Sequence, residues 1–213
     1  MLIREIRGFL KQFYSILKNM ESSITKETIS TLEPETFRGR ITVVQTLPQA
    51  EKAVKYLSKF PMIGFDTETR PSYKKGSYYS VSLIQLSTKS TCFLFRVNII
   101  GFPQCLADLL SNPDIKKIGL SLRDDFAAIN RRQKFAPKGF VDLQKIVPEY
   151  GITDISLQKI YALLFNKKIS KNQRLTNWEA DVLTAPQKKY AALDAWACLK
   201  IYNELHGKTI SAS

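Results

Sequence analysis

Histidine and cysteine are scarce in this chain, whose 213 residues include one histidine and three cysteines. With His206 alone, no histidine-based zinc cluster or catalytic triad is expected. Cys92, Cys105 and Cys198 are odd in number and far apart, which argues against a disulfide framework and against a cysteine-based zinc site. The pattern favours a reducing compartment, cytoplasmic or nucleoplasmic, over secretion.

Long apolar runs are also absent, so the sequence predicts no membrane-spanning helix. The N-terminal segment is interrupted by charge every few residues and lacks the apolar core of a signal peptide. We expect an amphipathic helix that contacts its own chain, a partner or a second copy; a membrane-surface helix and an Arg-rich targeting peptide are the alternatives. The apolar residues at helical spacing are Ile3, Ile6, Leu10, Phe13 and Leu17.

Acidic residues are outnumbered by basic ones. The chain has 32 Lys and Arg against 19 Asp and Glu, a formal net charge of +13. Such an excess favours a polyanionic partner, either nucleic acid or an anionic membrane surface. Apolar residues make up 44% of the chain, which excludes wholesale disorder and indicates a globular domain.

The pattern along the chain predicts three parts: an N-terminal helix and linker over 1–40, a main domain over 41–207, and a tail over 208–213. In the main domain, three consecutive strands are followed by alternating helices and strands. This order predicts an α/β fold with a mixed β-sheet flanked by helices on both faces. The expected strands are 41–44, 62–67, 81–87, 91–97, 115–120 and 139–141, and the expected helices are 46–59, 103–111, 125–134, 156–165 and 185–205.

Two acidic residues end the second expected strand. Asp66 and Glu68 are two positions apart, so their side chains point to one face about 6.6 Å apart along the strand. Two unpaired anions there repel each other and resist desolvation unless cations neutralise them. Carboxylate oxygens are hard ligands that select Mg²⁺ or Mn²⁺. The pair therefore indicates a divalent-metal site, with a solvated strand end as the alternative.

Two more acidic residues are expected to face the interior of the domain. Asp194 lies in the apolar arc of the last helix, and Tyr190 is on the same face one turn earlier. A carboxylate there is costly unless it binds something; a structural Asp bonded to the Tyr hydroxyl is the alternative. Asp125 opens an earlier helix on its inner face, whereas Asp124 points outward. A helix cap is the alternative for Asp125.

The order of these three motifs resembles the DEDD family of 3′→5′ exonucleases in its tyrosine variant. The resemblance covers residues 41–205, and Lys189 stands where the histidine variant has His. Two further segments, 156–160 and 175–178, are similar to segments of ribonuclease D and the Werner-helicase exonuclease domain. The motifs that carry the resemblance are Phe65-Asp-Thr-Glu68, Gly119 to Asp125, and Tyr190-Ala-Ala-Leu-Asp194.

The resemblance implies a ribonuclease H-like fold and a two-metal hydrolysis that releases nucleoside 5′-monophosphates from a DNA or RNA 3′ end. It implies two divalent ions, Mg²⁺ or Mn²⁺, with Asp66 bridging both. Glu68 and Asp194 would complete the first site, Asp125 would hold the second ion, and Tyr190 would orient the attacking water. A nucleic-acid-binding module that keeps the fold with weak catalysis is the alternative function. A hydrolase acting on a small nucleotide is a third.

Basic residues follow the first motif and precede Trp178, and tyrosines are interleaved with those after the first motif. Positive charge around an acidic centre, with aromatic residues nearby, is what a single-strand channel requires. An ordinary solvated face is the alternative for each run. The residues expected to bind nucleic acid are Arg70, Lys74, Lys75, Lys171 and Arg174.

Overall fold

The computed structural model describes residues 22–72 and 78–211, so the predicted N-terminal helix lies outside the described residues. Its strands are β1 (Arg40–Val44), β2 (Met62–Thr69), β3 (Val81–Ser87), β4 (Thr91–Phe95), β5 (Lys116–Gly119) and β6 (Phe140–Asp142). Its α-helices are α2 (Lys26–Thr31), α3 (Leu47–Leu57), α4 (Val97–Ile100), α5 (Gln104–Ser111), α6 (Leu122–Arg132), α7 (Leu143–Ile146), α8 (Leu157–Phe165) and α9 (Ala185–Ser211), and a 3₁₀ turn η1 spans Val147–Tyr150.

The strands form one mixed sheet in the order β1-β4-β3-β2-β5-β6. Strands β2, β3 and β4 are the predicted meander of antiparallel neighbours. The remaining pairings, β1 with β4, β2 with β5 and β5 with β6, are parallel. Strand β2, which carries the Asp-x-Glu motif, therefore lies inside the sheet with a neighbour on each side.

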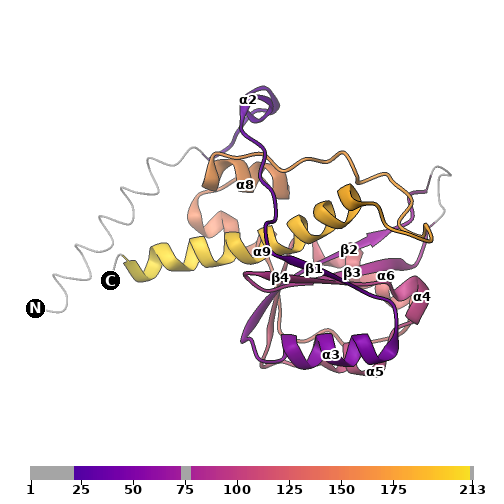
Figure 1. The fold of residues 1–213 in the computed structure, drawn as a ribbon. Coiled ribbons are helices and arrows are strands. Elements are labelled where there is room, and N and C mark those ends of the chain that lie inside the picture. Colours follow the sequence, from indigo (N-terminus) through magenta and orange to yellow (C-terminus); the bar gives the residue numbers. More distant parts are fainter. Residues whose placement is uncertain (1–21, 73–77, 212–213) are drawn as a thin grey trace, which may run out of the picture.

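Helices cover both faces of this sheet, which confirms the predicted fold class (Figure 1). One core contains buried side chains of α8 and α9 together with Leu83, and the other contains buried side chains of α3, α5 and α6 together with Ile84. Leu83 and Ile84 are adjacent in β3 and point to opposite faces. The long helix α9 therefore packs on the face opposite to α3 and α5.

A close approach between β2 and α9 depends on a glycine. A Cβ atom at Gly64 would lie 1.9 Å from the carbonyl oxygen of Ala195 and 3.2 Å from the Cβ of Leu199. Only hydrogen fits there, so the strand and the helix can touch through their backbones. Gly64 is two residues before Asp66, and Ala195 directly follows Asp194. The contact therefore places the two acidic residues next to each other.

Side chains cap the starts of α9 and α3 in two different ways. At α9, the Gln187 backbone N–H donates to Thr184 Oγ1 (3.3 Å), and the Thr184 N–H donates to Gln187 Oε1 (2.9 Å). At α3, the Gln49 N–H donates to Thr46 Oγ1, but the Gln49 side chain accepts from Gln45, one residue earlier than the motif requires. Helix α6 begins three residues before its expected start, and α9 continues past 205 to Ser211.

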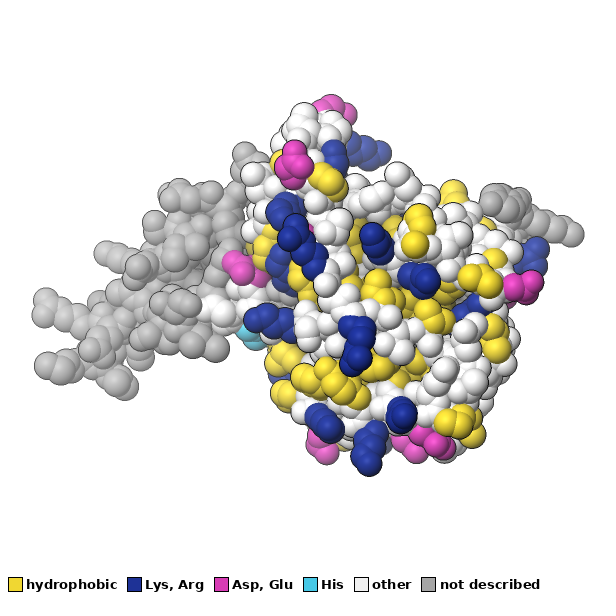
Figure 2. All heavy atoms as spheres, in the orientation of Figure 1, with side chains coloured by type: hydrophobic (Ala, Val, Ile, Leu, Met, Phe, Trp, Pro, Cys, Tyr) yellow, Lys and Arg dark blue, Asp and Glu magenta, His cyan; other side chains and the backbone are white. Residues whose placement is uncertain are grey.

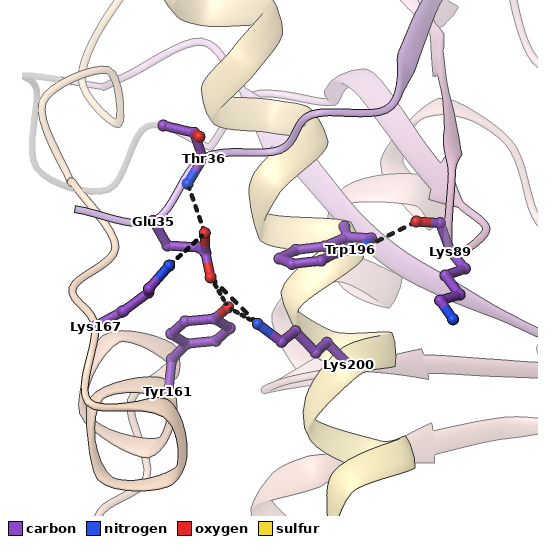
Figure 3. A network of polar contacts seen from close by, with 7 residues as sticks. All are labelled: Glu35, Thr36, Lys89, Tyr161, Lys167, Trp196 and Lys200. Carbon is purple, nitrogen blue, oxygen red and sulfur yellow. Dashed lines mark hydrogen bonds and ion pairs between the residues drawn. The ribbon is translucent and has the colours of Figure 1, made fainter. Parts of the chain in front are cut away.

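The segment before β1, expected as a linker, contains α2 and packs against the rest of the chain. Its anchor is Glu35, which accepts hydrogen bonds from the hydroxyl of Tyr161 on α8 (2.6 Å) and the ammonium of Lys200 on α9 (3.2 Å) (Figure 3). Lys167 lies 3.6 Å from the same carboxylate. Although desolvation acts in the opposite direction, hydrogen bonds from Tyr161, the Thr36 N–H and Lys200 lower the pKa of Glu35 to about 2. This cluster fixes the segment to both helices.

The loop between α8 and α9 is held at both ends. Glu35 and Lys168 are joined by a backbone hydrogen bond of 2.8 Å at its beginning. Near its end, the buried guanidinium of Arg96 donates to the carbonyl oxygens of Ala180 and Asp181. The loop carries Lys171 and Arg174, so these anchors determine where the two cations lie.

Candidate metal centre and active site

Three carboxylates meet where β2 passes under α9. Asp66 and Glu68 come from alternate positions of β2 and share a face, and Asp194 comes from the third turn of α9. One carboxylate oxygen from each lies within 4.8 Å of the other two. Glu68 and Asp194 are buried, and Asp66 is partly exposed. The structure thus brings together three of the four acidic residues expected from the sequence.

Burial and mutual repulsion disfavour the ionised form of these carboxylates when no cation is bound. Desolvation, followed by the charges of Asp194, Asp125 and Glu68, raises the pKa of Asp66 well above its usual range. Desolvation, followed by the charges of Asp194 and Asp125, does the same to the pKa of Glu68. Desolvation raises the pKa of Asp194 to about 7, although Tyr190 and Lys171 counteract it. A bound cation would therefore stabilise the ionised carboxylates, which burial and mutual repulsion otherwise disfavour.

The donor set fits a hard divalent cation. All of its ligand atoms are carboxylate oxygens, which Mg²⁺ and Mn²⁺ prefer. The Oδ1 atom of Asp194 is buried, and it has no hydrogen-bond partner within the described part of the chain. A buried carboxylate oxygen with no partner is costly, and a metal ion would satisfy it.

Asp125 lies beside this group without belonging to it. Its Oδ1 accepts a hydrogen bond of 2.5 Å from the hydroxyl of Thr67, which lies between the two acidic residues of β2. Its charge raises the pKa of both Asp66 and Glu68, so it is their neighbour. Desolvation, as the main cause, raises the pKa of Asp125 itself to about 7. Asp124, by contrast, is exposed, as its position on the helix predicts.

Two side chains that position Asp125 are not predicted from the sequence. One is the Thr67 hydroxyl. The other is Asp142 at the end of β6, whose carboxylate accepts from the backbone N–H groups of Ser121 (3.0 Å) and Leu122 (3.1 Å) at the start of α6. Ser121 has a left-handed backbone (φ 61°), which is unfavourable for serine, and the two hydrogen bonds to Asp142 hold the turn in this conformation. Asp142 could have been found in the sequence, because it is an acidic residue at the end of a predicted strand.

Tyr190 lies one helical turn before Asp194. Its hydroxyl hydrogen-bonds to the Asp194 carboxylate, and its ring lies 6.0 Å from the ring of the buried Trp178. Desolvation, followed by the charges of Asp194, Glu68 and Asp66, raises the pKa of Tyr190 further above its ordinary value. The side chain is therefore a neutral phenol at every pH near neutrality, able to donate a hydrogen bond.

Cations approach the acidic group from the loop between α8 and α9. The charge of Lys171 lowers the pKa of Asp194, and that of Arg174 lowers the pKa of Glu68. Arg70, just after β2, lies 3.8 Å from Glu179 and 5.4 Å from the ring centroid of Tyr79. The structure thus brings Lys171 and Arg174 to the site and sets Arg70 in a mixed cluster with Glu179. Lys74 and Lys75 lie outside the described residues.

The metal-free protein is expected to be more stable at pH 5 than at pH 8. The pKa of Asp125 and Asp194 is about 7 in the folded protein, against an ordinary value of 3.8, so the folded state keeps protons that the unfolded chain has released. This stabilisation is complete below the ordinary pKa and is lost as the pH rises through about 7. Thermal unfolding in EDTA between pH 5 and pH 8 measures it. A melting temperature that rises over this interval would contradict the expectation, and Mg²⁺ should flatten the dependence.

The mixed sheet with helices on both faces is a ribonuclease H-like fold, with the acidic group lying between β2 and α9. Residues 41–210 match a family described as 3′-5′ exonuclease. The chain belongs to this family, and its relatives are exonucleases of the DEDD type, as the motifs predicted. The structure resembles the Nibbler EXO domain of Aedes aegypti, with a TM-score of 0.74, 22% identity, and coverage of 83% of this chain and 93% of that one.

Two further similarities extend the comparison. The chain is 36% identical over 155 residues to the bifunctional 3′-5′ exonuclease/ATP-dependent helicase WRN of Mus musculus, a match that covers 70% of this chain and 11% of that protein. The chain therefore spans only a small part of that relative's length. Its structure also resembles that of Trypanosoma brucei RNase D in complex with RNA, with a TM-score of 0.70, 22% identity, and coverage of 80% and 64% of the two chains.

Among the helices of the described residues, none has the length and the apolar character needed to cross a membrane.

Proposed function

We propose that this chain is a metal-dependent 3′-5′ exonuclease that hydrolyses the terminal phosphodiester bond of DNA or RNA and releases nucleoside 5′-monophosphates. The observation that carries the proposal is the convergence of Asp66, Glu68 and Asp194 within 4.8 Å, with Tyr190 one turn away. Membership of the exonuclease family supports the reaction class.

The carboxylates would hold two divalent ions, Mg²⁺ or Mn²⁺. Asp66, Glu68 and Asp194 would hold one ion, and Asp66 with Asp125 would hold the other. When bound, such a pair of ions stabilises the charge that develops on the attacking and leaving oxygens of a phosphoryl displacement. Thr67 holds the Asp125 carboxylate in place, and the contact at Gly64 holds Asp194 over β2.

The hydroxyl of Tyr190 orients the attacking water. A neutral phenol cannot accept a proton as a general base, so its role is to hold the water by a hydrogen bond. Lys171 and Arg174 bind the phosphates of the strand close to the carboxylates.

Exposed aromatic residues next to arginines offer stacking surfaces for the bases. Tyr78 and Tyr79 are 77% and 38% exposed, and Arg131 lies 5.5 Å from the Tyr78 ring centroid. Base stacking on aromatic rings beside cations is how single strands are bound without sequence preference. Basic side chains are also spread widely over the face shown in Figure 2, with few acidic ones between them, in keeping with a net charge of +13.

Digestion of 5′-labelled single-stranded DNA and RNA tests the proposal. With Mg²⁺ or Mn²⁺ we expect a ladder of products shortened from the 3′ end, together with free 5′-monophosphates, and no products in EDTA. A circular single strand should remain intact, because an exonuclease needs an end. Binding of the linear strands with no hydrolysis under any metal condition would instead make the chain a nucleic-acid-binding module.

Tyr190→Phe is expected to lower the hydrolysis rate about 10- to 100-fold, at or below the lower limit of the range for general acid–base groups, because the hydroxyl only positions the water. Substrate affinity should change little, because the lost hydrogen bond belongs to the transition state. The ring and its packing against Trp178 are retained, so the melting temperature should also hold. Single-turnover kinetics with excess enzyme isolate this step. An unchanged rate with a lower melting temperature would make Tyr190 a structural hydroxyl.

A further inference from the structure

A polar side chain that the proposed mechanism does not use lies beside Asp66. Gln85 is in β3, directly opposite Asp66 in the antiparallel register. Residues paired in this way project from the same face of the sheet, with Cβ atoms about 4.5–5.5 Å apart. Gln85 is fully buried, and neither its Nε2 nor its Oε1 has a hydrogen-bond partner in the residues that the structure describes.

A buried carboxamide without partners is unfavourable in a core strand. The cross-strand neighbour of Gln85 on its other side is Leu94, and the next position of β3 on the same face is Leu83; both are buried apolar residues. An apolar side chain at position 85 would continue this surface without leaving two polar groups unpaired. The cost of Gln85 therefore needs a compensating interaction, and its cross-strand partner Asp66 carries a carboxylate on the same face of the sheet.

We propose that Gln85 is a positioning residue, whose Nε2 donates a hydrogen bond to one oxygen of the ionised Asp66 carboxylate and leaves the other oxygen to the cations. The inference rests on the proposed function, because Asp66 is ionised when the metal site is loaded. An amide suits this task for a chemical reason. It supplies an N–H donor with no charge, whereas a lysine would neutralise Asp66 and compete with the metal.

Gln85→Met tests the proposal, because methionine matches the volume of glutamine and removes the donor. Leu86→Met is the matched control: Leu86 is buried in the same strand and points to the opposite face, into the core with α3 and α5. Three quantities are measured for the full chain: Mn²⁺ affinity by calorimetry, kcat and KM on a single-stranded oligonucleotide, and melting temperature in EDTA. Gln85→Leu is a second variant with the same expectation.

For Gln85→Met we expect Mn²⁺ affinity and kcat each to fall about 10- to 100-fold, the usual effect of removing a group that orients a metal ligand. KM for the oligonucleotide should stay the same, and the melting temperature in EDTA should be unchanged or higher. Leu86→Met should leave the Mn²⁺ affinity and kcat within twofold of the wild type.

Two results would overturn the inference. In one, the Gln85 variants keep Mn²⁺ affinity and kcat within twofold of the wild type. In the other, their melting temperature in EDTA falls along with every other quantity, which would make Gln85 a structural residue. Failure of the proposed function looks different, since the wild-type chain would then neither bind Mn²⁺ nor cleave the oligonucleotide.

Discussion

Asp66→Ala is expected to abolish hydrolysis while the protein remains folded. Asp66 is the carboxylate shared by both proposed ion sites, and in the structure it is the one repelled by Asp194, Asp125 and Glu68 together. Removing it eliminates a metal ligand but also relieves this repulsion, so the melting temperature in EDTA should stay the same or rise. A variant that retains more than about a tenth of the wild-type rate would contradict the two-metal assignment. Its activation free energy would then have risen by less than about 1.4 kcal/mol.

A control separates the loss of a ligand from the loss of a charge. Asp108 is an exposed residue of α5, on the face of the sheet opposite to the site, where it accepts a hydrogen bond from Gln104. Asp108→Ala makes the same change in net charge and should keep full activity with no gain in stability. Oligonucleotide affinity, measured in EDTA, should be the same for both variants, because the phosphates are bound by cations and not by these acids.

The sequence predicted the sheet, and which of the acidic residues share a face, because both depend on local patterns. Asp66 and Glu68 share a face because a strand alternates, and Tyr190 and Asp194 share one because a helix repeats every turn. The helix expected from residue 185 begins at that residue in α9. These signals involve residues within a few positions of one another, so no tertiary contact is needed to interpret them.

What the sequence could not show depends on residues far apart in the chain. Polar residues alternate with apolar ones along 81–87, yet all seven residues of β3 are buried because helices cover both faces. Gln85 is therefore in the core, although glutamine is a polar residue. Likewise Glu35 gives no hint in the sequence that it meets Tyr161 and Lys200, more than a hundred residues away.

The doublet at the start of α6 offers the most direct test of the geometry, because two adjacent residues of one type are predicted to behave differently. Asp125 faces Thr67 and the acidic group, whereas Asp124 is exposed. We expect Asp125→Asn to lower the hydrolysis rate by about 100-fold or more, the upper end for a group that orients a metal. Asp124→Asn should stay within twofold of the wild type.

The choice of asparagine makes the comparison specific to charge. In Asp125→Asn the side-chain carbonyl can still accept the hydrogen bond from Thr67, so the start of α6 should keep its conformation. The folded protein also loses a carboxylate whose pKa is raised to about 7 by desolvation, and the melting temperature in EDTA at pH 8 should therefore rise. Rates and melting temperatures of both variants, measured side by side in Mn²⁺ and in EDTA, give the answer. A larger rate loss for Asp124→Asn would mean that α6 presents its other face to the metal site.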